Sequence, residues 1–186
     1  MSVSDVGAIV VPGVYVLAAA LWTFRGLQDI EKLSYAASPL GCHDDYLDPE
    51  DAEKLAMLAC EKGADWLDAR NEVDLDAIYD VANESLFDRL DDQYEEFKRS
   101  LNAKNHDRAD IQLRTLEQHL DQQVGILKQI RDKHSRLGRE SLAKATEGRI
   151  LALNNRVKQR RMKIESGRSM RAQSQEIALA VIMVKP

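Results

Sequence analysis

Apolar and polar positions follow two different periods along this chain, and the change of period divides it into parts. Near the start, the apolar run VYVLAAALWTF (residues 14–24) is followed by the turn-like RGLQD (25–29) and by IEKLSYAAS (30–38). Short apolar runs separated by a turn of a few residues are typical of two paired strands. The pattern therefore predicts a β-hairpin whose first strand is buried.

A short helix is predicted after this hairpin. Asp48 is a natural N-cap, Pro49 suits the first helical position, and acidic residues fill the first turn. Leu55 and Leu58 belong to a narrow apolar stripe, and Gly63 is expected to end the helix.

A long amphipathic helix is predicted from about Asp74, because apolar residues then recur at spacings of three and four. These residues are Ile78, Ala82, Leu86, Leu90, Tyr94, Phe97 and Leu101. The pattern blurs at NAKNHD (102–107) and resumes as a seam of coiled-coil type. The seam consists of Leu113, Leu116, Leu120, Val124, Leu127 and Ile130. Whether the helix breaks near Asn105 is open from the sequence.

The chain is expected to reverse at HSRLGRES (134–141), which contains a glycine and cations that favour a helix end. A second apolar stripe follows, made of Leu142, Thr146, Ile150, Leu153, Val157 and Ile164. The two stripes match in length, so the two helices can mask each other in an antiparallel αα-hairpin.

The chain ends in EIALAVIMV (176–184), a β-branched apolar segment of the length of a buried strand. Such a strand needs a sheet, and the other strand-like segments are at the N-terminus. We therefore expect an α+β fold, mostly α: a long coiled-coil-like αα-hairpin projecting from a small antiparallel sheet made by the N-terminal hairpin and the C-terminal strand. The expected divisions are 1–70 for the β-hairpin and short helix, 71–170 for the helical hairpin and 171–186 for the returning strand, within one structural unit.

The uncharged run at residues 7–24 approaches the length of a membrane span. The leader MSVSD contains an acid and no cationic segment, and VPG (11–13) is typical of a turn. A β-hairpin is therefore the preferred interpretation, and no membrane association is expected.

Charge is distributed very unevenly along a chain whose net charge is −5. From Asp44 to Glu96 there are 19 Asp and Glu against four Lys and Arg, a net charge of about −15. From Lys128 to Arg171 there are 14 Lys and Arg against four acids, a net charge of about +10. Either the two blocks neutralise each other within a molecule or dimer, or the basic block faces an external polyanion.

Sequence motifs of catalysis are missing. The chain has no G-x-x-x-x-G-K-[ST], no G-x-G-x-x-G and no G-x-S-x-G. Paired carboxylates such as Asp91 with Asp92 and Glu95 with Glu96 are expected on a solvated helix face, where nothing tunes their acidity for catalysis. We therefore expect no enzymatic activity and no cofactor.

Potential metal ligands are also few. CHDD (42–45) and the pair His106 and Asp110 each offer too few ligands to close a metal site, so none is expected. Cys42 and Cys60 are too few for a disulfide scaffold, which favours a reducing cytoplasm as the location.

The order of these parts resembles the carboxyl-terminal region of bacterial SNF2-family helicase-like ATPases. The matching pieces are the strand pair at 14–38, LDPEDAEKL (47–55), GADW (63–66), the long charged helix, TEGRILALNNRVKQRRMKIES (146–166) and IALAVIMV (177–184). These ATPases often close with a long αα-hairpin and a final hydrophobic strand that returns to a sheet. The resemblance covers most of the chain and lies in the order of the pieces.

The resemblance implies an accessory domain that follows two RecA-like lobes and serves nucleic-acid contacts, positioning of the motor or docking of a partner. Both lobes and all ATP-binding motifs are missing from this sequence, so catalytic activity is not carried over. The implied partners are DNA or RNA and either the ATPase core of a parent helicase or another protein.

The leading hypothesis is a non-catalytic accessory module whose basic helix contacts a nucleic-acid backbone. The candidate residues are Arg156, Lys158, Arg160, Arg161, Lys163, Arg168 and Arg171. Phosphate neutralisation by such a cluster is independent of sequence and sensitive to salt. No aromatic residues interleave with the cations, which disfavours base stacking.

The rival hypothesis is a coiled-coil scaffold or oligomerisation protein with no nucleic-acid role. The acidic block of one chain would then meet the basic block of the next, for example in a homodimer formed through the helices.

Overall fold

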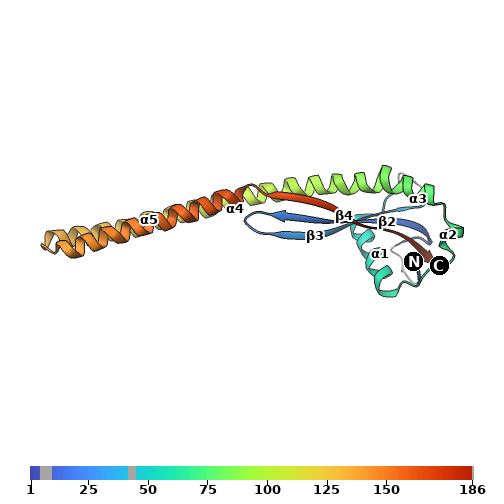
Figure 1. Cartoon of the computed structure of the whole chain (residues 1–186), viewed down its shortest axis with the longest axis horizontal. Helices are drawn as coiled ribbons and strands as arrows, with labels where there is room; N and C mark the ends of the chain where they lie inside the picture. The colour runs from blue at the N-terminus through green and yellow to red at the C-terminus, as the bar shows by residue number, and fades with distance from the viewer. Residues whose placement is uncertain (5–9, 42–44, 186) are drawn as a thin grey trace. The chain divides into compact units, whose positions relative to one another are not determined.

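The computed structural model describes residues 1–4, 10–41 and 45–185 (Figure 1). The chain divides into two compact units. We call Met1–Phe24, Ile30–Arg99 and Ala172–Pro186 the sheet unit, and Arg25–Asp29 with Ser100–Arg171 the hairpin unit. In chain order the strands and helices are β1 Ser2–Ser4, β2 Gly13–Arg25, β3 Ile30–Pro39, α1 Pro49–Lys62, α2 Ala69–Glu72, α3 Leu75–Val81, a π-helical turn Ala82–Leu86, α4 Phe87–Arg136, α5 Glu140–Arg168 and β4 Arg171–Lys185. The predicted α+β, mostly helical fold is confirmed.

The sheet has four strands in the order β1-β4-β2-β3. β2 and β3 pair in antiparallel fashion from Tyr15 opposite Pro39 to Phe24 opposite Ile30, which is the predicted hairpin. β1 pairs in parallel with the end of β4, with Ser2 opposite Met183, so the sheet is mixed and the prediction of a purely antiparallel sheet is wrong. The three residues of β1 are too few to show a strand period in the sequence.

β2 is the centre of the core, because it is buried on both of its faces. Side chains alternate between the faces of a strand. Leu17 joins a cluster with Leu55 of α1 and Ile182 of β4. On the other face, the rings of Trp22 and Phe24 pack against Tyr94 and Phe97 of α4, with ring centroids 5.4–5.9 Å apart. The continuous apolar run of β2 therefore reflects burial on two sides.

α4 runs without interruption through residues 102–107, so the helix does not break near Asn105. In the sheet unit its apolar stripe is buried at Leu90 and Tyr94, which are each at most 8% exposed, and Leu86 of the preceding π-helical turn is fully buried. No helix in the described ranges is both long and apolar enough to cross a membrane. Of the uncharged run at 7–24, residues 13–24 lie in β2 and residues 7–9 fall outside the described residues.

Replacing Leu55 by alanine is expected to destabilise the fold by about 2–5 kcal/mol, because the side chain is fully buried and its loss leaves a cavity. The same substitution at Leu67, which is 90% exposed, should change the free energy of unfolding by less than about 0.5 kcal/mol. Urea unfolding followed by circular dichroism measures both. Equal midpoints for the two variants would contradict the packing of α1 on the sheet.

The stability of the fold is expected to fall at high pH. Burial raises the pKa of Tyr15, Tyr35 and Tyr94 above the ordinary value of 10.0, because tyrosinate is poorly solvated there. The folded state thus holds these protons more tightly than the unfolded chain. Their contribution is complete below the unfolded pKa near 10.0 and is lost as pH rises through the folded pKa.

The urea midpoint should therefore stay level with respect to these tyrosines up to about pH 9 and fall above about pH 10. Tyrosinate absorbance, followed in parallel, should show that these tyrosines ionise at a higher pH in the folded chain than in urea. A triple Tyr→Phe variant at positions 15, 35 and 94 is the control, and an identical fall of its midpoint would contradict the assignment.

Candidate nucleic-acid interface

Within the hairpin unit, α5 lies antiparallel to the distal part of α4 (Figure 1). The chain reverses through Leu137–Arg139, where Gly138 has a φ of 68°. Residues with a side chain rarely adopt this left-handed backbone conformation, so glycine is the residue best suited to this reversal. The reversal lies inside the segment 134–141 that was expected to form the tip.

The seam between the two helices is narrow. Ala109 on α4 and Ala143, Ile150 and Ile164 on α5 are buried, whereas the leucines of the α4 seam are only half-buried. Leu142, expected in the return stripe, is 47% exposed, and Ala143 takes its place in the seam. Two helices alone have no third surface to cover the outer edge of their apolar stripes.

Three ion pairs connect the helices in a constant register. Arg131 pairs with Glu147 at 2.9 Å, Glu117 with Arg161 at 3.2 Å, and Asp110 with Arg168 at 2.7 Å. In each pair the two residues lie equally far before and after residue 139. Within each helix the three positions also differ by multiples of seven, so they occupy one repeated position of a coiled coil, the flank where ion pairs set partner and orientation.

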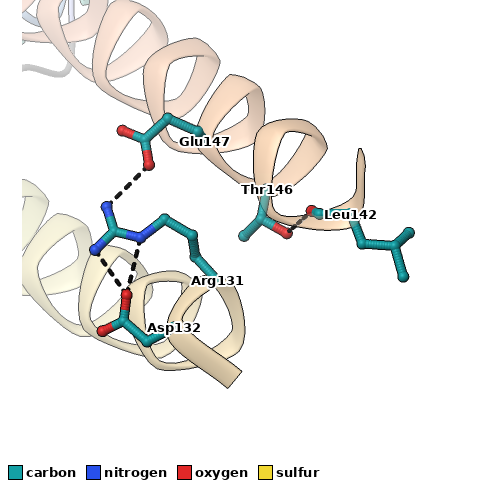
Figure 2. Close-up of polar contacts among 5 residues, drawn as sticks. All are labelled: Arg131, Asp132, Leu142, Thr146 and Glu147. Atoms are coloured by element: carbon teal, nitrogen blue, oxygen red, sulfur yellow. Dashed lines mark hydrogen bonds and ion pairs between the residues drawn. The ribbon is translucent and has the colours of Figure 1, made fainter. Parts of the chain in front are cut away.

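Figure 2 shows the ion pair nearest the tip. Arg131 reaches across to Glu147 and also contacts its neighbour Asp132 at 2.8 Å. The hydrogen bond to Glu147, followed by that to Asp132, raises the pKa of Arg131. The buried hydroxyl of Thr146 donates to the Leu142 carbonyl at 2.8 Å, so this polar seam residue is satisfied within its own helix.

Asn105 holds the base of the hairpin unit together. Its side chain is 5% exposed, and its amide nitrogen donates to the carbonyls of Gly167 and Arg168 at 2.9 and 2.7 Å. Its oxygen accepts from the Leu27 N–H in the β2–β3 turn at 3.3 Å. One amide thus satisfies two carbonyls at the end of α5, which have no partner within that helix, and ties the turn to both helices.

The opposite flank of α5 carries cations instead of ion pairs. Arg149, Arg156 and Lys163 recur at intervals of seven, and Arg160 follows Arg156 by four, so all four share one side of the helix. Successive members of the seven-residue series are about 10 Å apart along the axis. We call Arg149, Arg156, Arg160 and Lys163 the cationic stripe.

The α4 surface beside the cationic stripe has no carboxylate. Hollows of about 260 and 270 Å³ flank Arg160 and place it next to Gln112, Thr115 and His119 of α4. The acids of both helices within the unit fall on the other side of the seam, by the same helical spacing. They are Asp107, Asp110, Glu117, Asp121, Asp132, Glu140, Glu147 and Glu165. The four stripe cations are exposed and make no ion pair with any described residue.

The seven predicted site residues separate into distinct groups. Arg156, Arg160 and Lys163 lie together in the cationic stripe. Lys158 is exposed but lies on the acid-bearing flank, and Arg171 is exposed at the first residue of β4.

Arg161 and Arg168 are engaged within the molecule. Arg161 pairs with Glu165 and Glu117, and hydrogen bonding to Glu165, followed by attraction to Glu117, raises its pKa. Arg168 pairs with Asp110 and donates to His106 at 3.0 Å. The structure therefore does not bring all seven cations onto one surface.

Arg149 was missed among the candidate residues. The sequence contains a signal for it, because Arg149, Arg156 and Lys163 recur at intervals of seven residues. This interval identifies a shared flank only when the opposite flank, with its ion pairs, is known.

The potential metal ligands named from the sequence either have other partners or lie outside the described residues. His106 and Asp110 both contact Arg168. Residues 42–44 of the CHDD segment lie outside the described residues. Among the residues that are described, no group of three or more His, Cys, Asp or Glu side chains is placed to hold a metal ion.

Comparison of the chain with models of known protein families, with curated proteins and with solved structures found no match.

Asn105→Ala is expected to lower the free energy of unfolding by about 2–4 kcal/mol, because it leaves two carbonyls and an N–H without their partner at a buried site. Asn155→Ala, at an exposed position of α5, is the matched control and should be neutral or slightly stabilising. Thermal unfolding compares the two. Equal melting temperatures would show that the amide does not hold the base of the hairpin unit.

Proposed function

We propose that this chain is a non-catalytic module that contacts the sugar-phosphate backbone of DNA or RNA through the cationic stripe. The observation that carries the proposal is the separation of charge across the hairpin seam. On one flank, Arg131, Arg161 and Arg168 are neutralised by acids of the facing helix. On the other flank, the four cations of the stripe are exposed and form no ion pair with a residue that the structure describes.

The charge of the whole hairpin unit supports a polyanionic ligand. The unit contains 18 Lys and Arg against nine Asp and Glu, a net charge of about +9, although the chain is acidic overall. A row of exposed cations on a helix suits binding to phosphates. The affinity of such binding grows with the number of phosphates contacted and does not depend on the base sequence. No Phe, Tyr or Trp lies among Ser100–Arg171, so base stacking is not part of the proposal.

The proposal includes a setting for the module. We infer that it is an accessory, carboxyl-terminal-type domain of an SNF2-type helicase-like ATPase. The order of parts supports this, with a helical hairpin between an N-terminal strand pair and a last strand, β4, that lies beside β2 in the sheet. A cytoplasmic location belongs to the same proposal and rests on the small number of cysteines.

A second candidate function is a coiled-coil scaffold, and one observation favours it. Ile111 and Ile126 on α4 and Leu151 and Met162 on α5 are each about 60% exposed. Burying them requires helices from other chains on both sides of the hairpin, because Ile111 lines the hollow beside Arg160 and Leu151 shares the acid-bearing side with Lys158. Light scattering at high protein concentration tests this alternative, which requires a stable oligomer.

The nucleic-acid proposal predicts salt-sensitive binding of a labelled duplex, measured by fluorescence anisotropy across a salt series. Replacing Arg149, Arg156, Arg160 and Lys163 by Gln should weaken binding at low salt at least tenfold. Each phosphate contact adds about 0.9 to the slope of log affinity against log salt, so the variant should lose about 3–4 units of slope.

The matched control replaces Arg114, Lys128, Lys144 and Lys158 by Gln. These four cations are exposed, belong to the same unit and lie away from the stripe, so the control removes the same total charge. Its slope should change by less than about one unit. If the two variants lose equal affinity for the duplex, the stripe is not a distinct binding surface and only the overall positive charge matters. If the unmodified chain does not bind the duplex, the proposal is excluded.

A further inference from the structure

β4 has an edge that is only partly paired. On one side it pairs with β2, and on the other side β1 covers only Met183–Lys185. Next to β1, the amino group of Met1 donates to the Val181 carbonyl at 2.9 Å, and the Met1 carbonyl accepts from the Met183 N–H at 2.8 Å. Before Val181, no described residue forms a strand pair or backbone hydrogen bond on this side of β4.

The backbone groups on the open side can be assigned by alternation. In a strand, the N–H and C=O of one residue point to the same side, and successive residues alternate. Val181 and Met183 point towards β1, so Leu179 and Ile177 present their N–H and C=O groups to the same, open side. Their side chains are 44% and 48% exposed. A long apolar edge of this kind is a template for an additional strand.

A groove lies beside this edge. It has a volume of about 310 Å³ and lies between β4 and α1, with Tyr35 of β3 among its lining residues. Ala178 and Ala180 on one wall and Ala56 and Ala59 on the other are small, so the groove leaves room for an incoming apolar side chain. Strand addition beside an apolar groove gives affinity through the backbone and selectivity through the side chains.

The charge around the groove indicates which strand would bind there. The sheet unit contains 22 Asp and Glu against eight Lys and Arg, a net charge of about −14. Glu53 of α1 is close enough to Tyr35 to raise the pKa of that phenol further, after the larger effect of burial. A second copy of the sheet unit would bring like charges together, whereas a basic segment would be attracted.

We propose that the open edge of β4 and the adjoining groove bind an extended peptide segment of a partner protein, in which apolar side chains alternate with Lys or Arg. The segment pairs with Ile177 and Leu179 as an added strand and places an apolar side chain in the groove. This surface lies in the sheet unit and is independent of the nucleic-acid proposal.

The test titrates the full chain into a labelled, end-blocked peptide of sequence Lys-Val-Lys-Val-Lys-Val-Lys. Binding is expected. Two control peptides carry N-methyl groups, one on the Val residues and the other on the Lys residues; because an added strand pairs through alternate residues, only one of the two should bind at least tenfold more weakly. A third control peptide has Glu in place of Lys and should also bind at least tenfold more weakly. Equal binding of both N-methylated versions would overturn strand addition, and equal binding of the Glu peptide would overturn the charge argument.

Two variants locate the site. Leu179→Pro removes an N–H on the open side, where proline is tolerated in an edge strand, and should abolish peptide binding with the circular dichroism spectrum unchanged. Met57→Lys, at a position that is 57% exposed and lines the groove, should weaken binding at least threefold by repulsion. If Leu179→Pro does not fold, Met57→Lys alone decides, and unchanged binding by it would overturn the site.

Replacing the four stripe cations by Gln should leave peptide binding unchanged, so failure of one proposal is distinguishable from failure of the other. Light scattering of the unmodified chain tests whether a second copy of the chain occupies the open edge instead. A dimer that competes with the peptide would show that a second copy occupies the edge, and would overturn the proposal.

Discussion

The position of β4 between β1 and β2 is the constraint on which the rest of the structure depends. β2 is the most buried strand, and one of its two neighbours consists of the last residues of the chain. The sheet cannot be completed until the chain has passed through α4 and α5 and come back. This requires a reversal, provided at Gly138, and a helix, α5, that returns along the distal part of α4. Non-local pairing of this kind forms slowly as a rule, because its loop-closure entropy must first be overcome.

The two flanks of the helical hairpin have different roles: one aligns the helices, and the other presents exposed cations. On one flank, three ion pairs recur at multiples of seven residues. They disfavour a shifted alignment of the two helices, because a shift would separate the oppositely charged partners. Exposed ion pairs add little stability, so their main effect here is to specify alignment. Asn105 adds the buried contact that ties the helix ends to the β2–β3 turn. The other flank is then free of acids, and its cations are available to an external anion.

The sequence predicted part of the candidate site. It identified α5 as the basic helix and included Arg156, Arg160 and Lys163 among the seven candidate residues. It also assigned Arg161 and Arg168 to the same surface, because the facing acids Glu117 and Asp110 are more than forty residues away and their register is unknown until the hairpin is folded. The same register was needed to recognise Arg149. The sequence left open whether the helix breaks near Asn105, because this amide gains its partners only from α5 and the turn.

By itself, the sequence determined the elements whose periodicity is local: the buried strand pair, the helix α1, the two long amphipathic helices, the glycine reversal and the apolar last strand. The Asp48 side chain, predicted to cap α1, makes no capping hydrogen bond. These follow from the spacing of apolar residues, which each element displays along its own length. Only the tertiary structure decided which charges are neutralised, which polar residue is buried, how β1 joins the sheet and which edge of β4 stays open. Those outcomes depend on contacts between segments distant in the chain, and no local pattern records them.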